Sequence, residues 1–343
     1  MSDPLRRPAI QRIVVFGATG HLGEQIVARL DDMPGAQLEV VGVASEGSAG
    51  AEFELRGELL DAETTAPALR RSDLVFICTP PRAVPEIVRA ALHAAALCID
   101  CSGVMAQQPE VAMPLHAAEP DSESPLVAVP SAATLAWAPL LEALAQAPGL
   151  TRVVGTVLQS ASALGRAGLV SLSEESIALF NQSEIPEIGP AGQGVAFDVI
   201  PNAVAESRTA AELQRVIDPE LRIDVMHLQV PTFVGEGASL SIELASPLAE
   251  ADFAKRLAEL ADFECVAEGI GSRGLVPVEA GMREPTGPTL RDSAGAEKIL
   301  VGGIRADASL AAGLGWRVWL SYDPARVVAV HAIRLASLRL HGR

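Results

Sequence analysis

The stretch Arg12-Ile13-Val14-Val15-Phe16-Gly17-Ala18-Thr19-Gly20-His21-Leu22-Gly23 decides the fold of this chain. Its first five residues form a mostly apolar run that is typical of a buried parallel strand. Three glycines with the spacing Gly-x-x-Gly-x-x-Gly then lead into a helix through Ile26, Val27 and Leu30. Glycine has no Cβ where backbone must meet a pyrophosphate, and a helix N-terminus favours that charge. The stretch therefore predicts a dinucleotide-binding loop, with a tight turn that binds nothing as the alternative. We expect the nucleotide contacts at Gly17, Thr19, Gly20, His21, Leu22 and Gly23.

Strands and helices continue to alternate along the first 130 residues. Further apolar runs at Leu38–Ala44, Leu74–Cys78 and Ala96–Asp100 predict strands, and the segment through Ile87, Val88 and Leu92 predicts a helix. Such alternation indicates a doubly wound, Rossmann-like parallel sheet. Nucleotides bind such sheets at the carboxyl ends of the strands, where the glycine loop lies.

The residues after the second predicted strand bear on the choice of nucleotide. They read Ser45-Glu46-Gly47-Ser48, and Glu46 follows the last loop glycine by about 23 positions, close to the ~20 at which an acidic residue meets a ribose 2′-hydroxyl. A carboxylate there repels the 2′-phosphate of NADP. We therefore expect Ser45, Glu46 and Ser48 to border the nucleotide and NAD to be favoured over NADP. A solvated glutamate, or decayed nucleotide binding, is the alternative.

The pattern changes after Pro130, where an α+β domain with a large, mostly antiparallel sheet is predicted. A helix through Leu135 and Leu144 precedes a strand at Arg152–Leu158. We expect the next two strands, Leu221–Val234 and Ala238–Ala245, to be antiparallel neighbours joined at Gly235-Glu236-Gly237. Two more strands are expected at Ile299–Ala306 and Trp316–Leu320, and Asp323-Pro324 is a strong start for a last helix that returns to the first domain. The predicted divisions are residues 1–130, 131–321 and 322–343.

Composition excludes several classes of protein. The 343 residues include 26 basic and 43 acidic side chains, for a net charge of −17, which argues against nucleic acid or an anionic membrane as partner. The sequence has no apolar run of the ~18 residues that a membrane span needs, and its N-terminus does not resemble a signal peptide, so a cytoplasmic location is expected. Cys98 and Cys101 form a C-x-x-C motif, but without a second ligand pair packed thiols are favoured over a metal or redox role.

A second segment, Val129-Pro130-Ser131-Ala132-Ala133-Thr134, precedes the apolar helix. Together with the glycine loop it resembles the aspartate-β-semialdehyde dehydrogenase family, in which this segment usually reads Pro-Asn-Cys-Ser/Thr-Thr. The resemblance extends from Arg12 to about Leu340. It implies NADP as cofactor, a homodimer built through the second domain, and the amino-acid biosynthesis reaction in which aspartyl phosphate is reduced to its semialdehyde.

The resemblance also implies that the catalytic set has been replaced. The family's nucleophilic cysteine falls on Ala132, its histidine base on Glu236, and its substrate-binding arginine on Gln229. The family's phosphate-binding arginine falls on Ala106, and the arginine that pairs with NADP falls on Gly47. Other positions persist or are loosely matched: Gln159 stands where the family has a glutamine near the substrate, Arg208 where it has a lysine, and His331 where it has an asparagine.

Loss of a covalent nucleophile alone can cost on the order of 10⁶ in turnover. The first hypothesis is therefore a dimeric pseudoenzyme with a binding or regulatory role, whose cleft takes a nucleotide or a small acidic metabolite. The second is an active NAD(P)-dependent oxidoreductase on a semialdehyde or acyl phosphate. It would use rewired residues, with Cys101 near the cleft and Glu236 as a base of raised pKa.

Overall fold

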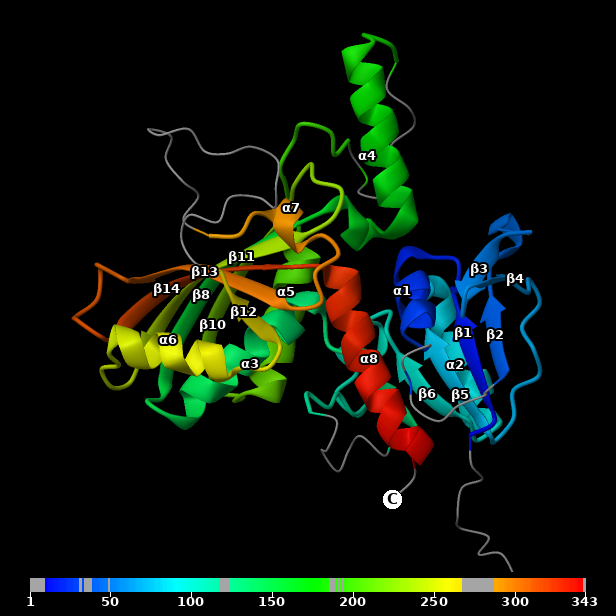
Figure 1. Cartoon of the computed structure of the whole chain (residues 1–343), viewed down its shortest axis with the longest axis horizontal. Helices are drawn as coiled ribbons and strands as arrows, with labels where there is room; N and C mark the ends of the chain where they lie inside the picture. The colour runs from blue at the N-terminus through cyan, green and yellow to red at the C-terminus, as the bar shows by residue number, and fades with distance from the viewer. Residues whose placement is uncertain are drawn as a thin grey trace, which may run out of the picture. The chain divides into compact units, whose positions relative to one another are not determined.

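The computed structural model describes residues 10–30, 33, 39–48, 50–116, 124–184, 189, 192, 194–266 and 287–341, and Figure 1 traces the chain. The chain divides into two compact units. Residues 1–131 and 328–343 make the first unit, and residues 132–327 make the second. The boundary between residues 327 and 328 falls within the C-terminal helix. The first turn of this helix therefore belongs to the second unit, and the rest belongs to the first.

The first unit is built on a five-stranded parallel sheet with the order β2-β1-β5-β6-β7. The chain passes from β1 to β2 on one side and then returns to β5 on the other, so the strand order reverses at β1. This is the doubly wound sheet that the sequence predicts. The elements are β1 (Arg12–Phe16), α1 (His21–Leu30), β2 (Glu39–Val43), β5 (Asp73–Ile77), α2 (Val84–His93), β6 (Leu97–Asp100), β7 (Leu126–Ala128) and most of α8 (Pro324–His341), with a hairpin of β3 (Glu52–Leu55) and β4 (Glu58–Asp61).

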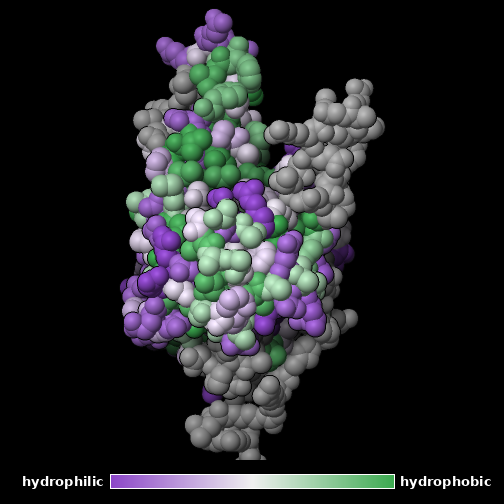
Figure 2. Space-filling model, turned by 90° about the vertical axis from the view of Figure 1, so that its left-hand side faces the viewer, coloured by the Kyte–Doolittle hydropathy of each residue, from purple (hydrophilic) through white to green (hydrophobic). Residues whose placement is uncertain are grey.

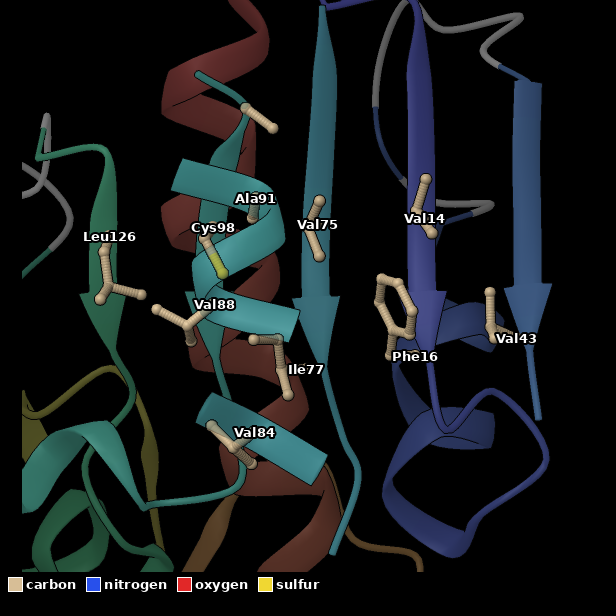
Figure 3. Close-up of a cluster of buried hydrophobic side chains, with 11 residues drawn as sticks. Val14, Phe16, Val43, Val75, Ile77, Val84, Val88, Ala91, Cys98 and Leu126 are labelled. Atoms are coloured by element: carbon tan, nitrogen blue, oxygen red, sulfur yellow. The ribbon is translucent and has the colours of Figure 1, made fainter. Parts of the chain in front are cut away.

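A hydrophobic core packs one face of this sheet against α2. Figure 3 shows Val84, Val88 and Ala91 of α2 clustered with side chains of the strands. All five residues of β1 are buried, because the strand lies inside the sheet with neighbours on both sides. Arg12 is buried at the start of β1 and is paired with Asp73 of β5, with 2.7 Å between Nη2 and Oδ2. The cluster consists of Val14, Phe16, Val43, Val75, Ile77, Val84, Val88, Ala91, Ala96, Cys98 and Leu126.

The second unit contains a seven-stranded sheet with the order β12-β13-β14-β11-β8-β10-β9. Four of its six strand pairings are antiparallel, as the sequence predicts. Its strands are β8 (Leu150–Gln159), β9 (Ile200–Pro201), β10 (Arg222–Gln229), β11 (Glu236–Leu244), β12 (Phe263–Cys265), β13 (Ile299–Ala306) and β14 (Gly315–Tyr322). Its helices are α3 (Ala132–Gln146), α4 (Gly165–Phe180), α5 (Ala203–Val216), α6 (Glu250–Glu259) and α7 (Leu290–Ser293).

One predicted pairing in this sheet is wrong. The strands β10 and β11 are not neighbours, because β8 lies between them and pairs with β10 in parallel and with β11 antiparallel. The glycines that suggested a tight hairpin have other roles. Gly235 has a φ of +90°, and a Cβ added there would meet the Leu290 carbonyl oxygen at 1.9 Å. Gly237 lies within β11 and faces Leu290 and Trp319.

The helix expected at Asp323-Pro324 does begin there. Asp323 Oδ1 accepts the backbone N–H groups of Ala325 and Arg326 at 3.1 and 3.2 Å, as an N-cap residue does. Asp323 Oδ2 also accepts from the Gly295 N–H at 2.9 Å, which ties the cap to the segment after α7. Among the helices that the structure describes, none is long and apolar enough to cross a membrane.

Candidate functional site

The glycine loop joins β1 to α1 in the first unit. Gly17 has a φ of +84°, and a Cβ added to it would meet the Cys78 carbonyl oxygen at 2.5 Å. A Cβ on Gly23 would meet the Gly17 carbonyl oxygen at 2.0 Å. Close backbone packing thus excludes a side chain at Gly17 and at Gly23. A Cβ on Gly20 would have more room, because its nearest contact would be 3.2 Å away. The N–H groups in the first turn of α1 have no partner within the helix and are directed out of its N-terminus.

Two polar atoms beside this loop are buried and make no hydrogen bond within the described part of the chain. They are Nε2 of His21, in the first turn of α1, and the hydroxyl of Thr79, just after β5. Buried polar groups without partners are uncommon in proteins and call for an explanation. Their position at the carboxyl ends of β1 and β5, where the strand order reverses, fits the binding of a dinucleotide. His21 and Thr79 would then contact the nucleotide together with the backbone of the loop.

The predicted selectivity residues lie at the carboxyl end of β2. Glu46, Gly47 and Ser48 form a short 3-10 turn directly after the strand, and Ser45, Glu46 and Gly47 are exposed. Oγ of Ser45 lies 3.4 Å from Oγ of Ser48. The strand β2 is bound to β1, and the Gly17 N–H donates to the Val43 carbonyl at 2.7 Å. The turn therefore follows a strand end that is hydrogen-bonded to the glycine loop, and the Glu46 carboxylate is exposed there.

In the second unit, four polar side chains form a row across four neighbouring strands. Gln229 of β10 pairs with Gln159 of β8. Gly237 pairs with Leu158, so that Glu236 lies opposite Gln159, and Glu236 in turn pairs with Tyr322 of β14. Paired residues project on the same face of a sheet, so the four side chains share one face. The row thus brings together three of the residues that the sequence predicts for the site, and Tyr322 is a fourth member that no sequence pattern indicates.

The two glutamines in this row are held by hydrogen bonds. Nε2 of Gln229 donates to the Gln159 carbonyl oxygen at 3.0 Å, and Nδ2 of Asn202 donates to Oε1 of Gln159 at 3.1 Å. Asn202 also caps α5, because its Oδ1 accepts from the Ala205 N–H. Gln229 is buried and carries no charge, so it cannot offer the bidentate, charged grip of an arginine.

Glu236 is the one ionisable side chain at the centre of the row, and its pKa is strongly shifted. Burial raises the pKa of Glu236 to about 8, the neighbouring Tyr322 hydroxyl opposes the rise, and the Asp323 carboxylate adds to it. Its side chain is therefore mostly protonated at neutral pH. A neutral carboxylic acid can donate a proton or a hydrogen bond, and it can act as a base only above that pKa.

Ala132 begins α3, which covers the same face of the sheet. A Cβ on Gly155 of β8 would meet the Trp137 ring at 2.3 Å, so α3 packs against β8. The short connection of residues 147–149 makes the two elements antiparallel, and Ala132 therefore lies toward the end of β8 that carries Gln159. A methyl group stands at this helix N-terminus, where a thiol would be exposed to the positive end of the helix dipole.

A buried polar chain fixes the first turn of α3 to α5. Oγ1 of Thr134 donates to Oε2 of Glu212 at 2.7 Å, and Nε of Arg208 lies 2.8 Å from Oε1 of the same carboxylate. Beside them, Nε2 of the buried His227 lies 3.0 Å from Oγ1 of Thr209. Burial lowers the pKa of His227 to about 4, and Arg208 adds to this effect. Arg208, the loosely matched cation, is thus paired with Glu212.

The remaining sequence candidates lie outside these two groups. Ala106 is buried in a 3-10 turn after β6. His331 is a buried residue of α8, and its Nε2 lies 3.0 Å from the Pro114 carbonyl oxygen, as expected for a packed helix residue. Cys101 is also buried, and the neighbouring Cys78 thiol, followed by burial, raises the pKa of its thiol well above the usual value. It therefore lacks the thiolate that a substitute nucleophile needs. In the described ranges no three acidic, histidine or cysteine side chains are placed to hold a metal ion.

The chain combines a glycine loop at the strand-order reversal of a parallel sheet with a second unit that holds a large mixed sheet. Residues 12–136 match the semialdehyde dehydrogenase NAD binding domain, and residues 141–324 match the semialdehyde dehydrogenase dimerisation domain. The chain belongs to the semialdehyde dehydrogenase family.

Individual relatives agree with this assignment. The aspartate-semialdehyde dehydrogenase of Synechocystis is 26% identical, over 96% of this chain and 98% of the relative. The solved structure of aspartate semialdehyde dehydrogenase II from Vibrio cholerae has the same fold, with a TM-score of 0.83 and 21% identity over 97% of this chain and 99% of the other. The NADP complex of the Candida albicans enzyme has a TM-score of 0.68 and 16% identity over 96% and 98%.

Proposed function

We propose that this protein is a family member that binds ligands without catalysing the family reaction, and that it has a regulatory or binding role. The observation that carries the proposal is the methyl group of Ala132 at the N-terminus of α3, where the family resemblance puts the cysteine nucleophile. Gln229 and Glu236 occupy the places of the arginine and the histidine base. With a neutral amide and a largely protonated acid at these positions, the row offers neither a charged grip for a carboxylate nor an imidazole base.

An active oxidoreductase with rewired residues is the second candidate. The raised pKa of Glu236 favours it, since a carboxyl group with a pKa of about 8 is tuned for proton transfer near neutral pH. The state of Cys101 opposes it, because that thiol is buried and its pKa is raised. Acid–base chemistry by Glu236 would then have to proceed without a covalent thioester.

Nucleotide binding in the first unit is part of the proposal, with NAD preferred over NADP and contacts at Gly17, Thr19, Gly20, His21, Leu22, Gly23, Ser45, Glu46 and Ser48. The close packing of Gly17 and Gly23 and the unpartnered His21 Nε2 support a nucleotide. The exposed Glu46 carboxylate after β2 supports the preference, because it repels a 2′-phosphate.

A homodimer formed through the second unit also belongs to the proposal. That unit matches a dimerisation domain, and it exposes large apolar side chains on α4 and in the segment after it. Phe180 and Phe197 are 77% and 65% exposed, although their rings pack edge to face at 5.5 Å. Figure 2 shows hydrophobic surface gathered near the top of the view, where α4 lies. Such a patch is typical of a protein interface.

The test is a calorimetric titration of NAD and NADP against the purified protein, followed by an assay of semialdehyde oxidation with phosphate. We expect NAD to bind more tightly than NADP, and turnover to stay at the level of a protein-free control. Turnover comparable with that of an active relative assayed alongside would overturn the proposal. Turnover that persists in Ala132→Gly but disappears in Glu236→Gln would instead establish the rewired oxidoreductase.

A further inference from the structure

Two cysteines follow the ends of adjacent strands in the first unit. The strands β5 and β6 are parallel neighbours, and their register ends with Ile77 paired with Asp100. Cys78 and Cys101 are the next residues, and the Cys101 N–H donates to the Ile77 carbonyl at 2.9 Å. The register therefore places the two cysteines opposite each other, about 4.8 Å apart between strands.

This spacing suits a disulfide, for which Cα atoms usually lie about 4.4–6.8 Å apart. Both cysteines are free, and Cys78 is the neighbour that most affects the Cys101 thiol, which itself donates to the Ile99 carbonyl oxygen at 4.0 Å. The partner of Cys101 is therefore Cys78 and not Cys98, the residue with which it forms the C-x-x-C motif. Cys98 is a member of the hydrophobic core on the α2 side, where Figure 3 shows its sulfur among apolar side chains.

Cys78 is the accessible member of the pair. It is partly exposed, whereas Cys101 is buried. Its backbone also borders the glycine loop, because the Cys78 N–H donates to the Phe16 carbonyl at 2.8 Å and its own carbonyl lies against Gly17. A small molecule that reaches the carboxyl ends of these strands from solvent can therefore meet Cys78 first.

We propose that Cys78 and Cys101 form a modification site for peroxides, which convert the two thiols into an intramolecular disulfide. The Cys78 thiolate attacks one peroxide oxygen, the O–O bond breaks, and the released hydroxide leaves as water, giving a sulfenic acid. The Cys101 sulfur then attacks the Cys78 sulfur, the S–O bond breaks, and the hydroxide leaves with the Cys101 proton as a second water. Two thiols are oxidised and one peroxide is reduced, and a dithiol reverses the change by exchange.

The environment of Cys101 determines how fast the bridge forms. The neighbouring Cys78 thiol and burial raise the pKa of this thiol, so little thiolate is present at neutral pH. The second step is therefore slow compared with that of a redox sensor of low pKa. Because the strand register places the two cysteines opposite each other, attack within the chain needs no diffusion of a partner.

The test treats the reduced, full-length protein with hydrogen peroxide under native conditions, alkylates the remaining thiols and identifies the products by mass spectrometry. We expect a peptide linked between Cys78 and Cys101, a loss of about 2 Da from the intact chain, and recovery of both thiols with dithiothreitol. Cys98→Ser should give the same linked peptide. Cys101→Ser should give oxygen adducts on Cys78 without a link, while circular dichroism reports that the variants are folded.

Two results would overturn the proposal. One is oxidation confined to Cys265, the exposed thiol, while Cys78 and Cys101 stay free through prolonged treatment. The other is a link that includes Cys98. Both are read from the unsubstituted chain, so the test does not depend on the folding of any variant.

Discussion

Glu236 and Tyr322 lie directly opposite each other across β11 and β14, and both side chains are buried. The carboxyl group is held in its neutral form by burial, and the phenol pKa is raised well above its usual value, first by burial and then by Glu236. The pair therefore places a proton, and no net charge, at the centre of the polar row. A site built to bind anionic substrate groups would need a positively charged side chain at this position.

This neutral state makes folding stability depend on pH. The pKa of Glu236 is about 8 in the folded chain and near 4.5 in the unfolded chain, so the stabilisation is complete below about pH 4.5 and is lost as pH rises through about 8. Between about pH 6.5 and pH 8, we expect the free energy of unfolding to fall by about 1 kcal/mol per pH unit from this group. Denaturant titrations at several pH values measure this slope.

The control is Glu236→Gln, which keeps the shape and removes the ionisation. Its stability should be nearly flat over that interval, apart from groups that both proteins share. Equal slopes for the two proteins would show that Glu236 is not held neutral in the folded state.

Glu175 on α4 accepts hydrogen bonds whose contribution to folding stability can be tested. Its buried carboxylate accepts hydrogen bonds from Oγ of Ser171 and from the backbone N–H groups of Val195 and Ala196, at 2.6, 2.6 and 2.9 Å. We expect Glu175→Ala to lower the free energy of unfolding by about 2–4 kcal/mol, because two backbone donors lose their acceptor. The neighbouring Glu174 is exposed, so Glu174→Ala should change stability by less than about 0.5 kcal/mol. Similar losses in the two variants would contradict this role.

The glycine loop can be tested by adding single methyl groups. The Gly23→Ala Cβ would lie 2.0 Å from the Gly17 carbonyl oxygen, whereas at Gly47 the nearest atom is Oγ of Ser45 at 3.9 Å. We expect Gly23→Ala to lower the free energy of unfolding by about 1–3 kcal/mol and to weaken binding of NAD, and Gly47→Ala to leave both nearly unchanged. Calorimetry and thermal unfolding measure the two effects. Tight NAD binding by Gly23→Ala would argue against a nucleotide at this loop.

The sequence was most informative where the determining interactions are local. The glycine loop, the strand before it and the helix cap at Asp323 were predicted correctly, because each depends on neighbours along the chain. The order of β10, β8 and β11 was predicted wrongly, because Gly235 and Gly237 resemble a hairpin turn between β10 and β11. The strand that separates β10 from β11 is β8, which comes from about 70 residues earlier in the chain. Strand pairing is a non-local property that short-range patterns do not determine.

In the candidate site, too, the sequence indicates individual residues, whereas only the fold determines how they are arranged. Gln159, Gln229 and Glu236 could be named from a resemblance, but their alignment in one row follows only from the sheet register. Tyr322 was missed because a tyrosine at a strand end carries no signal of its partner. The pairing of Cys78 with Cys101 by strand register was not predicted for a similar reason, since the C-x-x-C spacing drew attention to Cys98.

A burst experiment shows whether the site around Ala132 and the polar row can form a covalent intermediate. The protein is mixed rapidly with nucleotide and semialdehyde without phosphate, and the absorbance of reduced nicotinamide is followed, since a burst reports a covalent enzyme intermediate. The control is Ala132→Cys, which returns a thiol to the N-terminus of α3. We expect no burst from the unsubstituted chain. A burst equal to the concentration of subunits would contradict it.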